Sequence, residues 1–361
     1  MTTYHDIIKS TFPDNYEKFE SEYLSTLLPL TKEKVNQLLN NLYINDIKNS
    51  DSWHDHYTHS KHEFKNKVID FIVQQGMDLN EIKLIHNRPQ INLLQFFFDE
   101  FENSCDIIKH FIKRGYNINT QNQNGEILLG RTLINKNKDS HDLALFLLDN
   151  GADPFISDIW NDFPLKTSIE KKQANIFKMI CEKYPEKIKY FNPEQNRKIA
   201  LGLLYHKDLE WYKTVIEAMP GFDINYSIES DFNLNRNKTL LSSCISSKCF
   251  DICHYLLSKG ADPSLEKPFI GTSSLTQCFQ GLCSDNMSVE NLEQYELLAL
   301  ALIKKGANPK LSLDKTYEEI PLDYVSEEQK GKYIAAYTEY EKKILVEKIN
   351  LPAKKKAIQR I

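Results

Sequence analysis

Short apolar stretches with helical spacing end repeatedly in a glycine that is followed by a polar turn. Clear examples are the apolar stretches 71–73, 145–148 and 300–303, each of which precedes such a glycine by a few residues. Glycine adopts positive φ without a steric penalty and therefore closes the last turn of a helix. An Asp or Asn two residues later suits a turn, because its side chain bonds nearby backbone amides. The pattern predicts a succession of helices separated by short turns.

These glycines also keep a period. They are Gly76, Gly115, Gly151, Gly221, Gly260 and Gly306. Their spacings are 39, 36, 70, 39 and 46 residues, and the interval of 70 equals two periods of 35, with Pro185 where a glycine is missing. A period of about 20–50 residues is typical of repeat architectures. We therefore predict an all-α solenoid of helix–turn–helix units over residues 61–325.

The units resemble the ankyrin repeat, which has a β-turn, two helices, a period of about 33 residues and a Thr-Pro-Leu-His-x-Ala signature. In that family the signature leucine follows the glycine by fourteen residues. Here Leu129 follows Gly115, and Leu165 follows Gly151, by the same distance. Ile199 keeps this distance from Pro185, and Leu241, Leu275 and Leu322 fit with insertions. The resemblance implies a protein-binding scaffold.

Two further signature positions describe how far these units diverge. The alanine position, where helices meet, holds residues that are not large: Thr132, Ser168, Gly202, Cys244, Cys278 and Val325. The histidine of the family is replaced at every site: Gly130, Lys166, Ala200, Ser242, Thr276 and Asp323. The fold therefore follows from the resemblance more directly than any particular partner does.

Two segments lie outside the predicted array. Residues 1–60 contain helical spacing, and Thr31 is a plausible helix start. Because the ends of a solenoid need a polar covering, we predict that this segment is a helical N-terminal cap. Residues 326–361 contain an amphipathic stretch, 327–349, and a basic tail, 354–360. We predict a C-terminal capping helix followed by a frayed end.

The charge, the cysteines and the apolar runs of the chain limit the kinds of partner and surroundings that we expect. The formal net charge of −5 disfavours a nucleic-acid binder, which needs a basic face to displace counterions from phosphates. The seven cysteines have no regular spacing, which favours a reducing compartment such as the cytoplasm. The densest apolar run, 297–303, is far shorter than the about 20 residues that cross a bilayer. We expect a monomer that binds another protein, with no membrane span.

Two clusters could hold a metal ion. His54, His56, His59 and His62 lie close together around Asp55, although the spacing matches no known finger or metalloprotease pattern. The alternative is a polar connector between the cap and the array.

The second cluster comprises Cys244, Cys249, Cys253 and His254. At these helical positions cysteine behaves as a small apolar residue, which is the alternative to zinc binding. Common catalytic motifs are absent from the sequence, so we predict no catalytic residue, no metal and no cofactor.

The turns of an ankyrin-type array project as fingers along one edge, and large apolar side chains there have no structural duty. Phe155 and Trp160 lie in the finger after Gly151, and the finger before Leu241 is six residues longer than its counterparts. Tyr, Trp and Arg are frequent hot-spot residues. The predicted partner-binding residues are Phe155, Trp160, Tyr226, Phe232, Leu234, Arg236 and Lys238. Burial of Trp160 and Phe232 against a neighbouring finger is the alternative.

Three functions follow from these patterns. The first is a non-catalytic scaffold, and the Asn-, Lys- and Ile-rich divergent repeats resemble ankyrin-repeat effectors of intracellular bacteria, which are secreted into a host cell and bind host proteins. The second is an enzyme with a cryptic site at 54–62. The third is an immunity or antitoxin protein that binds a toxin.

Overall fold

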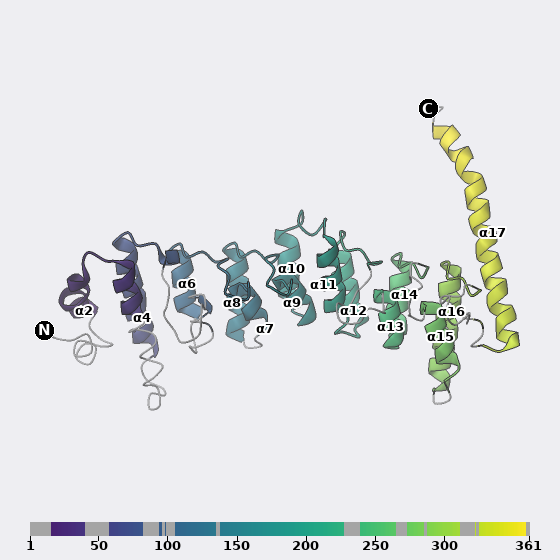
Figure 1. Cartoon of the computed structure of the whole chain (residues 1–361), viewed down its shortest axis with the longest axis horizontal. Helices are drawn as coiled ribbons and strands as arrows, with labels where there is room; N and C mark the ends of the chain where they lie inside the picture. Colours follow the sequence, from purple (N-terminus) through teal and green to yellow (C-terminus); the bar gives the residue numbers. More distant parts are fainter. Residues whose placement is uncertain are drawn as a thin grey trace. The chain divides into compact units, whose positions relative to one another are not determined.

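A computed structural model describes residues 16–39, 58–81, 94–95, 98, 105–134, 138–226, 239–264, 273–284, 287–310, 322 and 325–358. These residues form helices and turns, and no β-strand occurs among them, which confirms the predicted all-α class. The chain divides into two compact parts, Met1–Ile180 and Cys181–Ile361. The boundary falls within α10 (Ala174–Lys183), and the helices of both parts are labelled in Figure 1.

Within the described residues, the N-terminal part contains four repeats or part-repeats after short helical segments. Its elements are α2 (Tyr16–Glu22), η1 (Leu24–Leu27), a helical stretch 32–39, α4 (Thr58–Gln74), η3 (Leu79–Glu81), α6 (Cys105–Lys113), α7 (Leu128–Ile134), α8 (Lys138–Asp149), α9 (Pro164–Glu170) and α10 (Ala174–Lys183). The first helices of successive units pack together, α7 on α9. The second helices do the same, α4 on α6 and α6 on α8. This two-layer stacking of helix pairs is the ankyrin-type arrangement.

The C-terminal part has the same construction. Its elements are α11 (Pro193–Leu203), α12 (Leu209–Ala218), α13 (Leu240–Ser246), α14 (Phe250–Ser258), α15 (Ser274–Leu282), α16 (Val289–Lys304) and α17 (Glu327–Ile358). Helix α13 packs on α15, while α12 and α16 both pack on α14. Whether residues 61–325 form one continuous array stays a prediction.

The turn glycines behave as predicted at five of the six positions. Their φ values are positive, between 80° and 108°, at Gly76, Gly115, Gly151, Gly260 and Gly306. After these five glycines, the Asp or Asn two residues later accepts a hydrogen bond at 2.8–3.0 Å from the backbone N–H two residues further on. The expected helix-ending turn is therefore present in each of these units.

Gly221 has a different role, and its assignment as a helix-closing glycine is wrong. It is absent from the positive-φ positions of the described residues. A Cβ atom there would lie 2.2 Å from the carbonyl oxygen of Lys189. Gly221 is thus required for close approach of two backbone segments, next to the degenerate repeat at Pro185.

A ladder of asparagine side chains joins consecutive turns. Each asparagine lies four residues after its glycine and bonds the next turn twice, once through Nδ2 to the glycine carbonyl (3.1–3.3 Å) and once through Oδ1 to a backbone N–H (2.6–2.8 Å). The three rungs are Asn80 to Gly115 and Asn117, Asn119 to Gly151 and Asp153, and Asn225 to Gly260 and Asp262. These bonds set the register between neighbouring fingers within each part.

The core positions follow the signature register. The leucine-position residues are at most 4% exposed: Leu129, Leu165, Ile199, Leu241, Leu275 and Leu322. The alanine-position residues are buried as well: Thr132, Ser168, Gly202, Cys244, Cys278 and Val325. Both sets of signature positions therefore belong to the core.

The terminal segments agree with the predicted helices in part. Thr31 Oγ1 accepts a hydrogen bond from the Lys34 backbone N–H at 3.3 Å, as expected at a helix start. At the other end, α17 continues to Ile358 rather than stopping at Ile349. It packs on α16, and the ring of its buried Tyr333 lies 4.7 Å from that of Phe279. The capping role of both segments stays a prediction.

Candidate partner-binding surface

Two fingers of the N-terminal part have the same backbone design. In the finger that joins α6 to α7, Asn122 Oδ1 accepts hydrogen bonds from the backbone N–H groups of Asn124 and Glu126, both at 2.9 Å. Gly125 then turns the chain with φ 74°. The side chain of Asn122 therefore holds the fingertip together.

In the finger that joins α8 to α9, Asp158 takes the place of Asn122. Its Oδ1 accepts from the backbone N–H groups of Trp160 and Asp162, both at 2.8 Å, and Asn161 turns the chain with φ 58°. Trp160 stands at the position of Asn124. The carboxylate, rather than the indole, shapes this fingertip.

The two fingertips are joined to one another. The backbone N–H of Ile159 donates to the carbonyl of Asn124 at 2.8 Å. Gln121 Nε2 donates to the carbonyl of Gly125 at 2.7 Å and to that of Ser157 at 3.2 Å. The surface that they present has a defined backbone geometry.

Two large apolar side chains project from this surface. Trp160 is 56% exposed and Ile159 is 62% exposed. The alternative, burial of Trp160 against a neighbouring finger, is therefore wrong. Phe155 is half-buried, and its backbone N–H donates to Asp153 Oδ1 at 3.0 Å. Trp160 consequently remains the stronger binding candidate, and the half-buried Phe155 is the weaker one.

The remaining predicted residues belong to the C-terminal part. Tyr226 is half-buried, and its backbone N–H donates to the Asp223 carbonyl at 3.1 Å. The other members of the long finger, Phe232, Leu234, Arg236 and Lys238, lie outside the described residues. Their role in binding stays a prediction.

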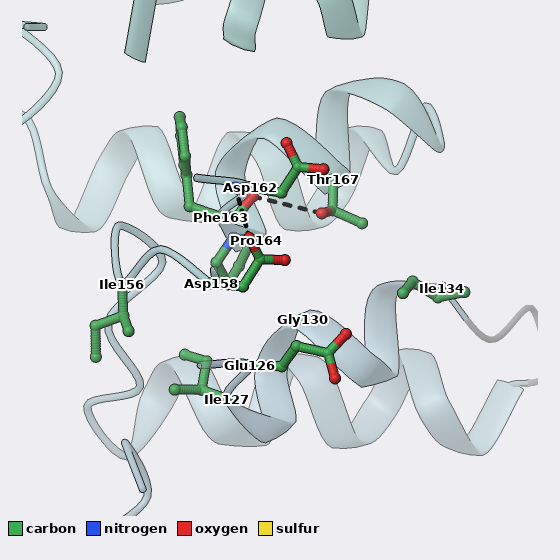
Figure 2. A pocket seen from close by; sticks show the side chains of 10 residues that line it. All are labelled: Glu126, Ile127, Gly130, Ile134, Ile156, Asp158, Asp162, Phe163, Pro164 and Thr167. Carbon is green, nitrogen blue, oxygen red and sulfur yellow. Dashed lines mark hydrogen bonds between the residues drawn. The ribbon is translucent and has the colours of Figure 1, made fainter. Parts of the chain in front are cut away.

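A hollow of about 40 Å³ lies between α7 and α9, next to the fingertips (Figure 2). Its lining is Glu126, Ile127, Gly130, Ile134, Ile156, Asp158, Asp162, Phe163, Pro164 and Thr167. Gly130 leaves this space open, since a Cβ atom there would meet only Pro164 Cγ at 3.9 Å. Ile134, at the end of α7, is 54% exposed. A groove lined by apolar and acidic residues thus lies beside the fingertip that carries Trp160.

The charged residues of the hollow are all acidic: Glu126, Asp158 and Asp162. Burial raises the pKa of the Asp158 carboxyl above its ordinary value, and the carboxylates of Asp162 and Glu126 add to this shift, whereas its backbone hydrogen bonds oppose it. Removing water from neighbouring carboxylates without a cation is unfavourable. Asp162 already bonds Lys166 Nζ at 3.3 Å, and Glu126 lies 3.8 Å from the Arg131 guanidinium. Asp158 is therefore the lining carboxylate without an ion pair among the described residues, and it favours a positively charged occupant.

The proposed metal clusters gain no support from the described residues. Residues 54–57 and the side chains of His59 and His62 lie outside them. Within the described residues, no group of three or more His, Cys, Asp or Glu side chains is arranged to hold a metal. Burial raises the pKa of the Cys244 thiol to about 12. Cys244 and Cys253 are buried, as the alternative expects of small apolar residues.

None of the helices in the described part of the chain combines the length and the apolar character that crossing a bilayer requires.

The similarity of this chain to known proteins lies in its structure. No protein-family model matches the chain, and no curated protein matches it. Among solved structures, the chain is similar to the ankyrin repeat domain of Bcl-3, described as a unique member of the IkappaB protein family. The two share 13% sequence identity and a TM-score of 0.47, over 69% of this chain and all of that domain. The ankyrin-type architecture described above rests on the helix pairs, the turns and the asparagine ladder of this chain.

Proposed function

We propose that this chain is a non-catalytic scaffold that binds another protein through the fingertip at Trp160 and the adjoining faces of α7 and α9. The observation that carries this proposal is the exposure of Trp160 and Ile159 on a turn whose shape Asp158 already fixes. Exposed aromatic residues without a folding role are typical of protein-binding surfaces. The long finger 226–238 is a second candidate contact.

Replacing Trp160 by alanine is expected to weaken partner binding by about 2 kcal/mol or more, about thirtyfold, because the indole is a hot-spot type of side chain. The melting temperature should stay at the wild-type value, since an exposed substitution changes stability by about 0.5 kcal/mol at most. The measurement pairs a thermal melt with a quantitative pull-down from a candidate proteome.

Tyr190→Ala is the matched control, because Tyr190 is also aromatic, is 80% exposed and lies outside the helices, directly after a turn. A partner retained by this control and lost by Trp160→Ala supports the proposal. Loss of the partner in both variants, or unfolding of the Trp160 variant, contradicts it. A Phe232→Ala/Arg236→Ala double variant tests the second candidate contact in the same way.

The finer proposal is that the partner is a host protein and that the chain is a bacterial effector. It is supported by the divergent, Asn- and Lys-rich repeats. The same pull-down is performed with animal-cell and bacterial lysates. A Trp160-dependent partner from the animal lysate favours the effector, whereas one from the bacterial lysate favours an immunity or antitoxin protein.

A further inference from the structure

The hollow between α7 and α9 arises from a difference between two neighbouring repeats. Gly130 of α7 and Lys166 of α9 occupy the same signature position, 36 residues apart. Lys166 is buried, whereas Gly130 has no side chain and leaves the space beside Pro164 open. A lysine is therefore present at this position in one repeat and missing from the other.

The carboxylates around Lys166 show which environment a lysine has at this signature position. Lys166 Nζ bonds the carboxylate of Asp162, one helical turn earlier, at 3.3 Å, and also that of Glu170. Burial acts to lower the pKa of Lys166, but these carboxylates raise it on balance, so the ammonium form is stabilised. The fold thus accommodates a cation at this position when a carboxylate stands four residues before it.

Glu126 stands four residues before Gly130, at the position that Asp162 has relative to Lys166. Its carboxylate accepts a hydrogen bond from Asn122 Nδ2 at 2.8 Å, and the Arg131 guanidinium is 3.8 Å away. Neither Arg131 nor any lysine lines the hollow. The Glu126 carboxylate is thus kept in place. This repeat has no counterpart of Lys166, because the equivalent position is Gly130.

Asp158 adds a second acceptor on the same side. Its Oδ1 is used by the two backbone N–H groups of the fingertip, and Oδ2 has no hydrogen-bond partner among the described residues. In Figure 2 the carboxylates of Glu126 and Asp158 lie between α7 and α9, with Ile127 and Ile156 beside them and Ile134 at the far end of α7. A long aliphatic stem with a cationic end matches such a space, since its methylene groups cover apolar surface while its charge meets the carboxylates.

We propose that this hollow binds a lysine or arginine side chain of the partner protein. That side chain occupies the place that a lysine at position 130 would fill, where this repeat has Gly130. An apolar residue next to that cation lies on Ile159 and Trp160. The inference rests on the proposed function, because it names the chemistry of the partner segment that the same surface recognises. Opposite charge in such a site gives specificity in addition to affinity.

The test uses four fluorescent mixtures of nine-residue peptides made from Ala, Ser and Leu, with the central residue fixed as lysine, arginine, norleucine or glutamate. Norleucine keeps an aliphatic stem and lacks the charge. Fluorescence anisotropy with the full chain is expected to show at least about tenfold tighter binding of the lysine or arginine mixture than of the norleucine and glutamate mixtures. This preference should shrink as salt concentration rises.

Two variants of the full chain test whether the preference for a lysine or arginine peptide arises at the hollow. Gly130→Lys supplies the missing cation from the chain itself and is expected to abolish the preference. Asp158→Asn is expected to reduce it severalfold without altering the turn, because Asn122 holds the neighbouring fingertip with the same pair of bonds. Gly331→Lys is the control, since Gly331 is exposed on α17 with open space around its Cα, and it should bind as wild type does.

Several outcomes would overturn the assignment. These are equal binding of the norleucine or glutamate mixture, no binding of any mixture, or a preference that persists in Gly130→Lys. The proposed scaffold function fails separately. If Trp160→Ala loses the partner while Gly130→Lys retains it, the scaffold stands and the cation pocket does not.

Discussion

Replacing Leu165 by alanine is expected to lower the free energy of unfolding of the N-terminal part by about 2–5 kcal/mol. Leu165 is 0% exposed and belongs to α9, which packs on α7. The substitution removes buried methyl groups and leaves a cavity that the surrounding helices fill only in part. Chemical denaturation followed by circular dichroism measures the loss.

Ile159→Ala provides the comparison for Leu165→Ala. Ile159 is an aliphatic residue of the same part of the chain, but it is 62% exposed. Its truncation should change the free energy of unfolding by about 0.5 kcal/mol at most. Equal losses for the two variants would show that the signature register does not define the core.

Two glycine-to-alanine substitutions should change stability in opposite directions. Gly221→Ala is expected to destabilise the C-terminal part by about 1–3 kcal/mol, because its Cβ would lie 2.2 Å from the backbone carbonyl oxygen of Lys189 and backbone must shift. Gly130→Ala is expected to stabilise α7 by up to about 1 kcal/mol, because alanine is the better helix former and its Cβ meets Pro164 only at 3.9 Å. Denaturant unfolding of both variants measures the two shifts.

The direction in which each glycine variant changes the free energy of unfolding tests one feature of the structure. A neutral Gly221→Ala variant would contradict the close approach of the two backbone segments. A destabilised Gly130→Ala variant would contradict the open space beside Pro164.

The repeat register could be predicted because it depends on local chemistry. A glycine that must adopt positive φ and an Asp or Asn that bonds the turn are both visible in sequence, as at Gly151 and Asp153. The leucine fourteen residues later then marks the core, and Leu165 is buried as expected. Gly221 shows the limit of this reasoning, because the same residue type served a contact with Lys189, distant in sequence.

The asparagine ladder has a sequence signature that the pattern of glycines and leucines does not contain. Asn80, Asn119 and Asn225 recur four residues after a glycine. Their function depends on the neighbouring turn, 32–37 residues away, which a pattern within one unit does not contain. A comparison of equivalent positions across repeats would have identified them.

The candidate surface was predicted in part. Trp160 was singled out because an aromatic residue in a fingertip has no folding role, and its exposure agrees. Ile159 adjoins Trp160 and is also exposed, but a single isoleucine in a turn is not a distinctive sequence signal. The hollow could not be predicted, because it depends on the space between α7 and α9 and on the omission of a side chain at Gly130. The sequence shows that glycine replaces the family histidine at position 130, but not that this leaves a hollow next to Pro164.

Photo-crosslinking from position 160 tests the central claim most directly. A photoreactive phenylalanine analogue replaces Trp160 in one variant and Tyr190 in a second, and each is irradiated with the proteome from which the partner is captured. The account predicts that the captured partner forms a covalent adduct from position 160 and not from position 190. Adducts of equal yield from both positions, or from position 190 alone, would contradict binding at the Trp160 fingertip.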